Sequence, residues 1–250
     1  MSDVYTMLIL AVMPMRNGLY VAGMTDTPDP ITHLRWIRPV NPYMYLLPDD
    51  IRYECPANHK EDGHLIANSN HARIRPATES IMRPGDIVHW RLGAGPAIAP
   101  YVEDTLVDPL HPQAQFVRRS HPFQLARFCA RHLDKAPDDV LIHKTRSLCL
   151  VRPDSICAVW CHDSTSGQYE ARMLLQIGAF VTHGHGIPVN DPVWRALGRR
   201  WLDGRTWFEQ SDTTLRERFG TIYLVIGRER TPDGRSTLSV VGVRAANIQR

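Results

Sequence analysis

The sequence predicts a mainly β protein in which two small β-barrels follow one another along the chain. Two apolar hairpins, one near each end of the 250 residues, contain the Asn-Gly and Asp-Gly pairs that tight hairpin turns prefer. Apolar and polar side chains alternate along further segments in each half, which is typical of half-buried strands. One stretch between the halves has helical spacing instead, so we expect two β-rich units joined by a helical connector.

The first hairpin consists of MLILAVM (7–13) and LYVAGMT (19–25), which flank the Asn17-Gly18 pair. Asn-Gly accepts the positive φ angles that a two-residue hairpin turn requires. LRWIRPV (34–40) follows a turn-rich segment and is predicted to be the third strand.

A long, mostly polar stretch from residue 41 to 80 separates this strand from RPGDIVHWRL (83–92). Pro84-Gly85-Asp86 is predicted to form a turn that starts the next strand. In that strand one face carries Ile87, His89 and Arg91, and the other carries Val88, Trp90 and Leu92. This alternation predicts a half-buried strand with a basic outer surface.

The pattern becomes helical between about Ser120 and Ala136, where Leu125, Phe128 and Cys129 recur at three- and four-residue spacing. Strand patterns then return in RSLCLVRPDS, SICAVWCHD and YEARMLLQIGAFV.

A further helix is predicted to begin after Asp191, whose carboxylate can cap it, with Pro192 at its first position. Its inner stripe would contain Trp194, Leu197, Gly198 and Trp201. The last hairpin joins TIYLVIGRER to STLSVVGVRA through a turn with Asp233-Gly234.

These elements divide the chain into three predicted parts. Residues 1–112 form the first barrel, residues 113–145 form the helical connector, and residues 146–250 form the second barrel with an inserted helix. The two β-rich parts show no repeat that we recognise residue by residue.

Composition restricts the classes of protein to which the chain can belong. Hydrophobic residues make up 43% and charged residues 22%, which is ordinary for a globular protein, and the apolar run MLILAVM is too short to cross a bilayer. Five cysteines, an odd number, favour reduced thiols and a cytoplasmic location. We expect no membrane association.

The net charge of +3 is too small to predict a nucleic-acid partner by itself, but the kind of cation is informative. Only Lys60, Lys135 and Lys144 among the 29 Lys and Arg residues are lysines. Arginine suits planar, bidentate contacts with phosphate or carboxylate. A GC-rich genome produces the same bias, so both explanations stay open.

Catalytic motifs are not evident. The chain has no Gly-x-Ser-x-Gly elbow and no Gly-rich loop followed by Lys and Ser or Thr, so we assign no catalytic residue and no cofactor. Two groups of residues contain potential zinc ligands, but neither has the spacing of a common zinc site, and we assign no metal. These groups are Cys55, His59, His64 and His71, and Cys157, Cys161, His162, His183 and His185.

Four short motifs resemble those of the dual OB-containing domain family, a group of prokaryotic proteins. They are WIRPV (36–40), PGDIV (84–88), RSLCLVRP (146–153) and PVNDPVW (188–194). The resemblance implies two OB-type barrels in tandem, with a helical connector and one further short helix, over nearly the whole chain. It also implies a nucleic-acid-binding role alongside mobile-element and defence proteins.

An OB barrel binds single strands with aromatic side chains that stack on bases and basic side chains that meet phosphates. The candidates in the first half are Arg35, Trp36, Arg38, Trp90 and Arg91. Trp36 has a second interpretation, because a tryptophan in a short strand is more often part of the core. The candidates in the second half are Arg195, Arg199 and Arg200.

The sequence therefore predicts a non-enzymatic protein that binds single-stranded or structured nucleic acid, as one component of a larger assembly. An alternative is an interaction or scaffold subunit in which the barrels bind a partner protein. A third is an enzyme that holds a metal with its histidine and cysteine groups.

Overall fold

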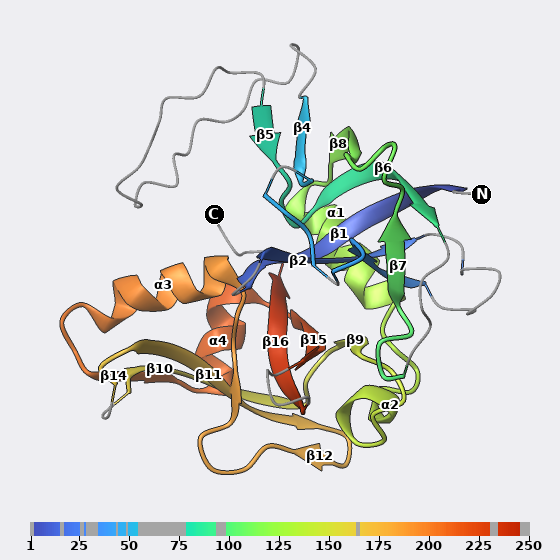
Figure 1. Ribbon diagram of the computed structural model, residues 1–250. Helices are drawn as coiled ribbons and strands as arrows, with labels where there is room; N and C mark the ends of the chain where they lie inside the picture. The colour runs from blue at the N-terminus through green and yellow to red at the C-terminus, as the bar shows by residue number, and fades with distance from the viewer. Residues whose placement is uncertain are drawn as a thin grey trace.

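A computed structural model describes residues 3–15, 18–25, 28, 35–43, 45–48, 50–54, 79–93, 99–163, 166–230 and 235–245 (Figure 1). Strands dominate these ranges and four helices accompany them, so the predicted mainly β class is confirmed. None of the four helices is long and apolar enough to cross a bilayer.

The first sheet contains six strands, and its order along the sheet differs from their order in the chain. In sheet order these are β1 (Asp3–Met15), β2 (Gly18–Thr25), β3 (Trp36–Val40), β7 (Asp104–Val107), β6 (Asp86–Gly93) and β8 (Gln115–Arg119). The long strand β1 pairs with β2 along its C-terminal part and with β6 along its N-terminal part. All pairs are antiparallel except β3 with β7, which is parallel. A short separate pair consists of β4 (Arg52–Glu54) and β5 (Glu79–Ile81).

The second half of the chain forms two further sheets. One contains β12 (Phe180–Val181), β11 (Tyr169–Ile177), β10 (Ser155–His162) and β14 (Trp207–Gln210), with β13 (Ile187–Pro188) also paired to β11. The other contains β16 (Ser236–Ala245), β15 (Ile222–Arg230) and β9 (Leu148–Val151). A parallel bridge between Val189 and Val240 links the end of β13 to β16. Both predicted hairpins are present as strand pairs β1–β2 and β15–β16.

Two helices match the sequence prediction closely. α1 (Pro122–Arg131) buries Leu125 and Cys129, the positions of its predicted apolar stripe. α3 (Pro192–Leu202) has the predicted cap, because the Asp191 carboxylate accepts the backbone N–H of Trp194 at 2.9 Å. The other oxygen of this carboxylate accepts an N–H of the Arg244 guanidinium at 2.8 Å, so the same side chain caps the helix and joins it to β16.

Some elements differ from the prediction. The segment 113–145 was predicted as a helical connector, and it contains α1 and α2 (Asp138–Leu141), but it begins with β8, which extends the first sheet beside β6. The buried Asp86 carboxylate holds β8 in place, because it accepts the Arg119 Nε–H at 2.7 Å. The second half also contains β14 and α4 (Asp212–Phe219), which were not predicted. Leu34, Asn17, the Asp233-Gly234 pair and most of residues 41–80 lie outside the described residues. Gly18, predicted as a turn residue, is instead the first residue of β2 and pairs with Met15.

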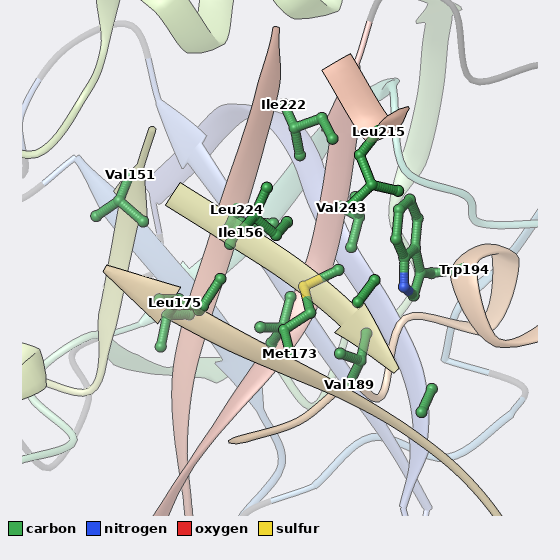
Figure 2. Packing of buried hydrophobic residues seen from close by; sticks show 14 of the residues in the cluster. Val151, Ile156, Met173, Leu175, Val189, Trp194, Leu215, Ile222, Leu224 and Val243 are labelled. Carbon is green, nitrogen blue, oxygen red and sulfur yellow. The ribbon is translucent and has the colours of Figure 1, made fainter. Parts of the chain in front are cut away.

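Each half has its own buried cluster. In the first half, Met7, Ile9, Val21 and Ile37 pack against β6 residues that include Trp90. In the second half, side chains from strands, α3 and α4 form one cluster, and Figure 2 shows Met173 within it, with Trp194 on one side and Ile156 and Leu224 on the other.

A third buried cluster contains residues of both halves, which we call the junction cluster. From the first half it takes Leu8, Leu10, Ala11, Met13, Tyr20, Ala22, Met24 and Trp36. From the rest of the chain it takes Leu125, Cys129, Leu148, Leu150, Tyr223, Val225 and Val241. The two halves therefore share a core, and in Figure 1 strands β9, β15 and β16 lie against β1 and β2.

Buried polar contacts also cross the junction. The Glu103 carboxylate, beside β7, accepts the backbone N–H groups of Ser147 and Leu148 and the Ser147 hydroxyl at 2.6 Å. The Arg244 guanidinium donates from Nε to the Leu10 carbonyl at 2.9 Å, across 234 positions of sequence. Since buried polar groups are costly without partners, these contacts fix one arrangement of the two halves.

Candidate functional site

The two predicted stacking residues of the first half are buried. Trp36 on β3 is 4% exposed and belongs to the junction cluster. Trp90 on β6 is 1% exposed, and its indole N–H donates to the Pro112 carbonyl at 2.9 Å. Neither ring has a face open to solvent, so neither can stack a base in this fold, and we leave both out of the candidate site. For Trp36 the core interpretation holds.

Arg38 is also an internal residue rather than a surface one. Its side chain pairs with the Asp104 carboxylate of the neighbouring parallel strand, and both side chains are at most 8% exposed. The guanidinium carbon lies 5.5 Å from the ring centroid of Tyr20 and 4.9 Å from that of Tyr101. An arginine enclosed in this way stabilises the β3–β7 pairing and has no side free for a phosphate.

Arg35 and Arg91 lie nearer the surface. The Arg35 side chain is partly exposed at the start of β3, and its carbonyl accepts the Thr25 N–H at 2.9 Å. Arg91 is exposed on β6, on the outward face predicted for it, while Val88, Trp90 and Leu92 point inward.

The three predicted arginines of the second half occur together on α3. Arg195 and Arg199 are one helical turn apart, and their guanidinium carbons lie 5.1 Å and 4.8 Å from the ring centroid of Tyr169 on β11. Arg200 is exposed and points roughly 100° around the helix from Arg199. We call Tyr169, Arg195, Arg199 and Arg200 the α3 surface.

Hydrogen bonds hold Tyr169 and Arg195 in place. The Tyr169 hydroxyl donates to the Arg195 carbonyl at 2.6 Å, and Arg195 returns an N–H to the Tyr169 carbonyl at 3.1 Å. A second N–H of Arg195 reaches the Val189 carbonyl at 3.4 Å. Arg195 therefore joins α3 to the sheet, whereas Arg199 stacks on the ring and is exposed.

The electrostatics of the α3 surface follow from its partial burial. Burial raises the pKa of Tyr169 to about 12, although Arg195 and Arg199 oppose this shift, so the phenol remains neutral. Burial, together with the charge of Arg199, lowers the pKa of Arg195. No acidic residue occurs in the α3 sequence PVWRALGRRWL. The α3 surface is thus a positive patch beside an aromatic ring.

Other arginines stack on aromatic rings nearby in the second half. Arg218 lies 4.4 Å from the ring centroid of Trp201, and Arg205 lies 5.7 Å from that of Phe208. Trp207, the residue before Phe208, is 52% exposed on β14. In the sheet, Trp207 is opposite Cys161 and Tyr169 is opposite His162, so both aromatic residues lie at the same end of β10. Because Cys161 and His162 are consecutive, the two aromatic side chains lie on opposite faces of the sheet.

Sequence reasoning missed Tyr169 and Trp207. Tyr169 follows the predicted Ser166-Gly167 turn, but only the long-range contact between β11 and α3 reveals its arginine neighbours. Trp207 lies in a short strand whose pattern, WFEQ, is too brief to predict.

The cysteines and histidines of the described ranges do not assemble a metal centre, since no group of three or more His, Cys, Asp or Glu residues there is placed to hold an ion. The Cys157 thiol instead donates to a Glu209 carboxylate oxygen at 3.2 Å. Burial, reinforced by this carboxylate, raises the pKa of Cys157 to about 12, which disfavours the thiolate that metals bind. Cys55, His59, His64 and His71 lie outside the described residues.

Two cavities border the junction of the halves. One of about 60 Å³ adjoins Tyr20, Arg38 and Tyr101, and another of about 130 Å³ adjoins Arg119 and Arg244. Sites for small organic ligands usually have roughly 300–1,000 Å³. The α3 surface is therefore a stronger candidate than either cavity.

Comparisons of the chain with protein-family models, with curated proteins and with solved structures found no match.

Proposed function

We propose that the protein binds nucleic acid through the α3 surface, on a framework of two OB-type barrels like those of the dual OB-containing domain family. The observation that carries the proposal is the stacking of Arg195 and Arg199 on Tyr169 at the edge of a helix that has three arginines and no acidic residue. A stacked guanidinium keeps N–H groups available for phosphate, and a neighbouring aromatic ring can take a base.

Strand pairing supports the OB framework. An OB barrel is a ring of five strands in the order 1-2-3-5-4, closing on strand 1, with strands 3 and 5 parallel. In the first half the pairings run β1–β2–β3–β7–β6 and return to β1, and β3–β7 is the parallel pair. In the second half they run from β10 through β11, β13, β16 and β15 to β9, the segment just before β10, and the parallel bridge joins β13 to β16.

One sequence feature recurs at equivalent points of these rings. The third strand ends in Pro39-Val40-Asn41 in the first half and Pro188-Val189-Asn190 in the second. Each half also has a buried Arg–Asp pair, but the order is reversed: Arg38 is on strand 3 and Asp104 on strand 5, whereas Asp191 follows strand 3 and Arg244 is on strand 5. The recurring triplet favours two units of the same kind, and the family resemblance implies two OB-type barrels in tandem.

The test is fluorescence anisotropy with labelled single-stranded DNA, single-stranded RNA and duplex DNA over a range of salt concentrations. We expect the logarithm of the affinity to fall linearly with the logarithm of salt. Arg199→Ala with Arg200→Ala should weaken binding several-fold. For a single strand, the salt slope should also decrease by about 0.7 for each phosphate that the variant no longer neutralises.

The matched control is Arg127→Ala with Arg131→Ala, which removes two exposed arginines from α1. It lowers the net charge equally and should leave affinity nearly unchanged. Equal decreases of affinity in both variants would mean that net charge, rather than the α3 surface, governs binding. No binding by the folded wild-type protein would refute the proposal.

The alternative function, a scaffold subunit that binds a partner protein, has one observation in its favour. Trp207 is 52% exposed on β14, which pairs only with β10 among the described strands. Exposed tryptophan and open sheet edges are common in protein interfaces. In either case we propose a cytoplasmic component of a mobile-element or defence assembly, and the free thiols of Cys129, Cys149, Cys157 and Cys161 are consistent with a reducing compartment.

A further inference from the structure

Strands β1, β2 and β3 are buried on both faces. Their inward side chains, such as Met7, Ile9 and Val21, fill the core of the first half. Their outward side chains, such as Leu10, Tyr20 and Trp36, are at most 4% exposed because they form the junction cluster. The face that an OB barrel presents to nucleic acid includes strands 2 and 3. In the first half that face is therefore covered by the second half.

The contact of the second half with β1, β2 and β3 combines close packing with buried polar contacts. Gly227 on β15 leaves room for the Tyr20 hydroxyl, which would lie 3.1 Å from a Cβ atom at that position. Arg244 and Glu103 add the buried polar contacts that cross the junction. Opening this face to a ligand would expose the junction cluster and leave these charged groups without partners, so both effects oppose it.

In the second half, the outer side of β11, the strand that corresponds to β2, is partly exposed. On the outer side of the β11–β10–β14 sheet, Trp207 is 52% exposed, and the Arg172 and Glu170 side chains are 29% and 35% exposed. Arg172 pairs with Glu170 at 2.7 Å, and the exposed Glu209 adds a second carboxylate to this face. Trp207 on this face and Tyr169 of the α3 surface lie at the same end of β10, but on opposite faces of the sheet.

We infer that the protein binds a short single strand of nucleic acid through one unit, which is its second half. The first half uses the corresponding face, on β1–β3, to bind the second half. This inference rests on the proposed function. A strand that passes around this end of the sheet would stack a base on Trp207 and bring its phosphates to Arg199, an arrangement that needs unpaired, exposed bases. One barrel contacts roughly 4–16 nucleotides, so lengthening a strand beyond about 16 should add little affinity.

The experiment measures the affinity of the full chain for oligothymidylates of increasing length and compares two matched double variants. Trp207→Ala with Arg199→Ala removes an exposed aromatic and an exposed arginine from the second half. Tyr43→Ala with Arg118→Ala removes the same two kinds of side chain from the first half, where Tyr43 is 75% exposed.

We expect the affinity of the second-half variant to fall roughly fivefold or more and the first-half variant to bind as the wild type does. Affinity should level off by about 16 nucleotides. Binding that keeps strengthening to twice that length, or that is abolished in the first-half variant, overturns the inference but leaves the proposed function intact. No binding by any strand overturns both, and tighter binding of duplex than of single strands overturns the single-strand assignment.

Discussion

At the scale of single residues, the buried pair of Arg38 and Asp104 has a measurable role in stability. Removing one partner leaves an uncompensated buried charge, which usually costs about 3–5 kcal/mol. We therefore expect Arg38→Ala to lower the free energy of unfolding by about this amount, as measured by urea denaturation. The nucleic-acid affinity of the folded fraction should stay unchanged, because the side chain is only 8% exposed.

The double variant Arg38→Ala with Asp104→Ala is the control, since it removes both charges. Its destabilisation should be smaller than the sum of the two single effects, because neither charge is then left alone. Additive effects, or a lower affinity of folded Arg38→Ala, would contradict this account of the residue.

At the scale of elements, the packing of α3 depends on Gly198. A Cβ atom there would lie 1.8 Å from Cδ1 of Trp160, so the helix can approach β10 only because this position has no side chain. Gly198→Ala should therefore destabilise the protein by about 1–3 kcal/mol through overpacking. Helix propensity alone favours alanine by about 1 kcal/mol, so the sign of the change in melting temperature separates the two effects.

Ala196 on the exposed side of α3 provides the comparison for this prediction. Ala196→Gly should cost about 1 kcal/mol from propensity alone, with no change in the environment of Trp160. A stabilising Gly198→Ala would mean that α3 and β10 lie farther apart than the structure has them.

At the scale of the whole molecule, the junction cluster makes the two halves one cooperative unit. Far-ultraviolet circular dichroism and tryptophan fluorescence should follow the same single transition in urea, because unfolding either half exposes the apolar surface of the other. A fragment that ends near residue 145 should expose the outer faces of β1–β3 and bind a hydrophobic dye. Two separated transitions, or a well-folded fragment, would show instead that the halves are independent.

Local patterns in the sequence predict many of the elements. The two hairpins follow from paired apolar runs separated by turn residues, and α3 follows from Asp191-Pro192 and its inner stripe, because these signals act over a few residues. β8 falls in the predicted connector because its five residues, QFVRR, are too few to show a clear period. α4 is missed because its sequence, DTTLRERF, has only two buried positions.

The site is less predictable than the elements. Alternation correctly places Trp36 on one face of a strand, but it does not reveal what covers that face. The covering residues, such as Leu148 and Val241, lie more than 100 positions further along the chain. Likewise, the clustering of Arg195, Arg199 and Arg200 on α3 could be predicted, whereas their stacking partner Tyr169 could not, because it depends on how β11 packs beneath the helix.

The contact between Leu10 and Arg244 has a consequence for biosynthesis. A ribosome synthesises β1 first and β16 late, so more than 200 further residues are added before the apolar outer face of β1 can be buried against β16. During that interval the nascent chain exposes Leu8, Leu10 and Trp36 next to unpaired strand edges, which is a state prone to aggregation. Chaperones that bind nascent apolar segments should therefore associate with this protein until translation has passed β16.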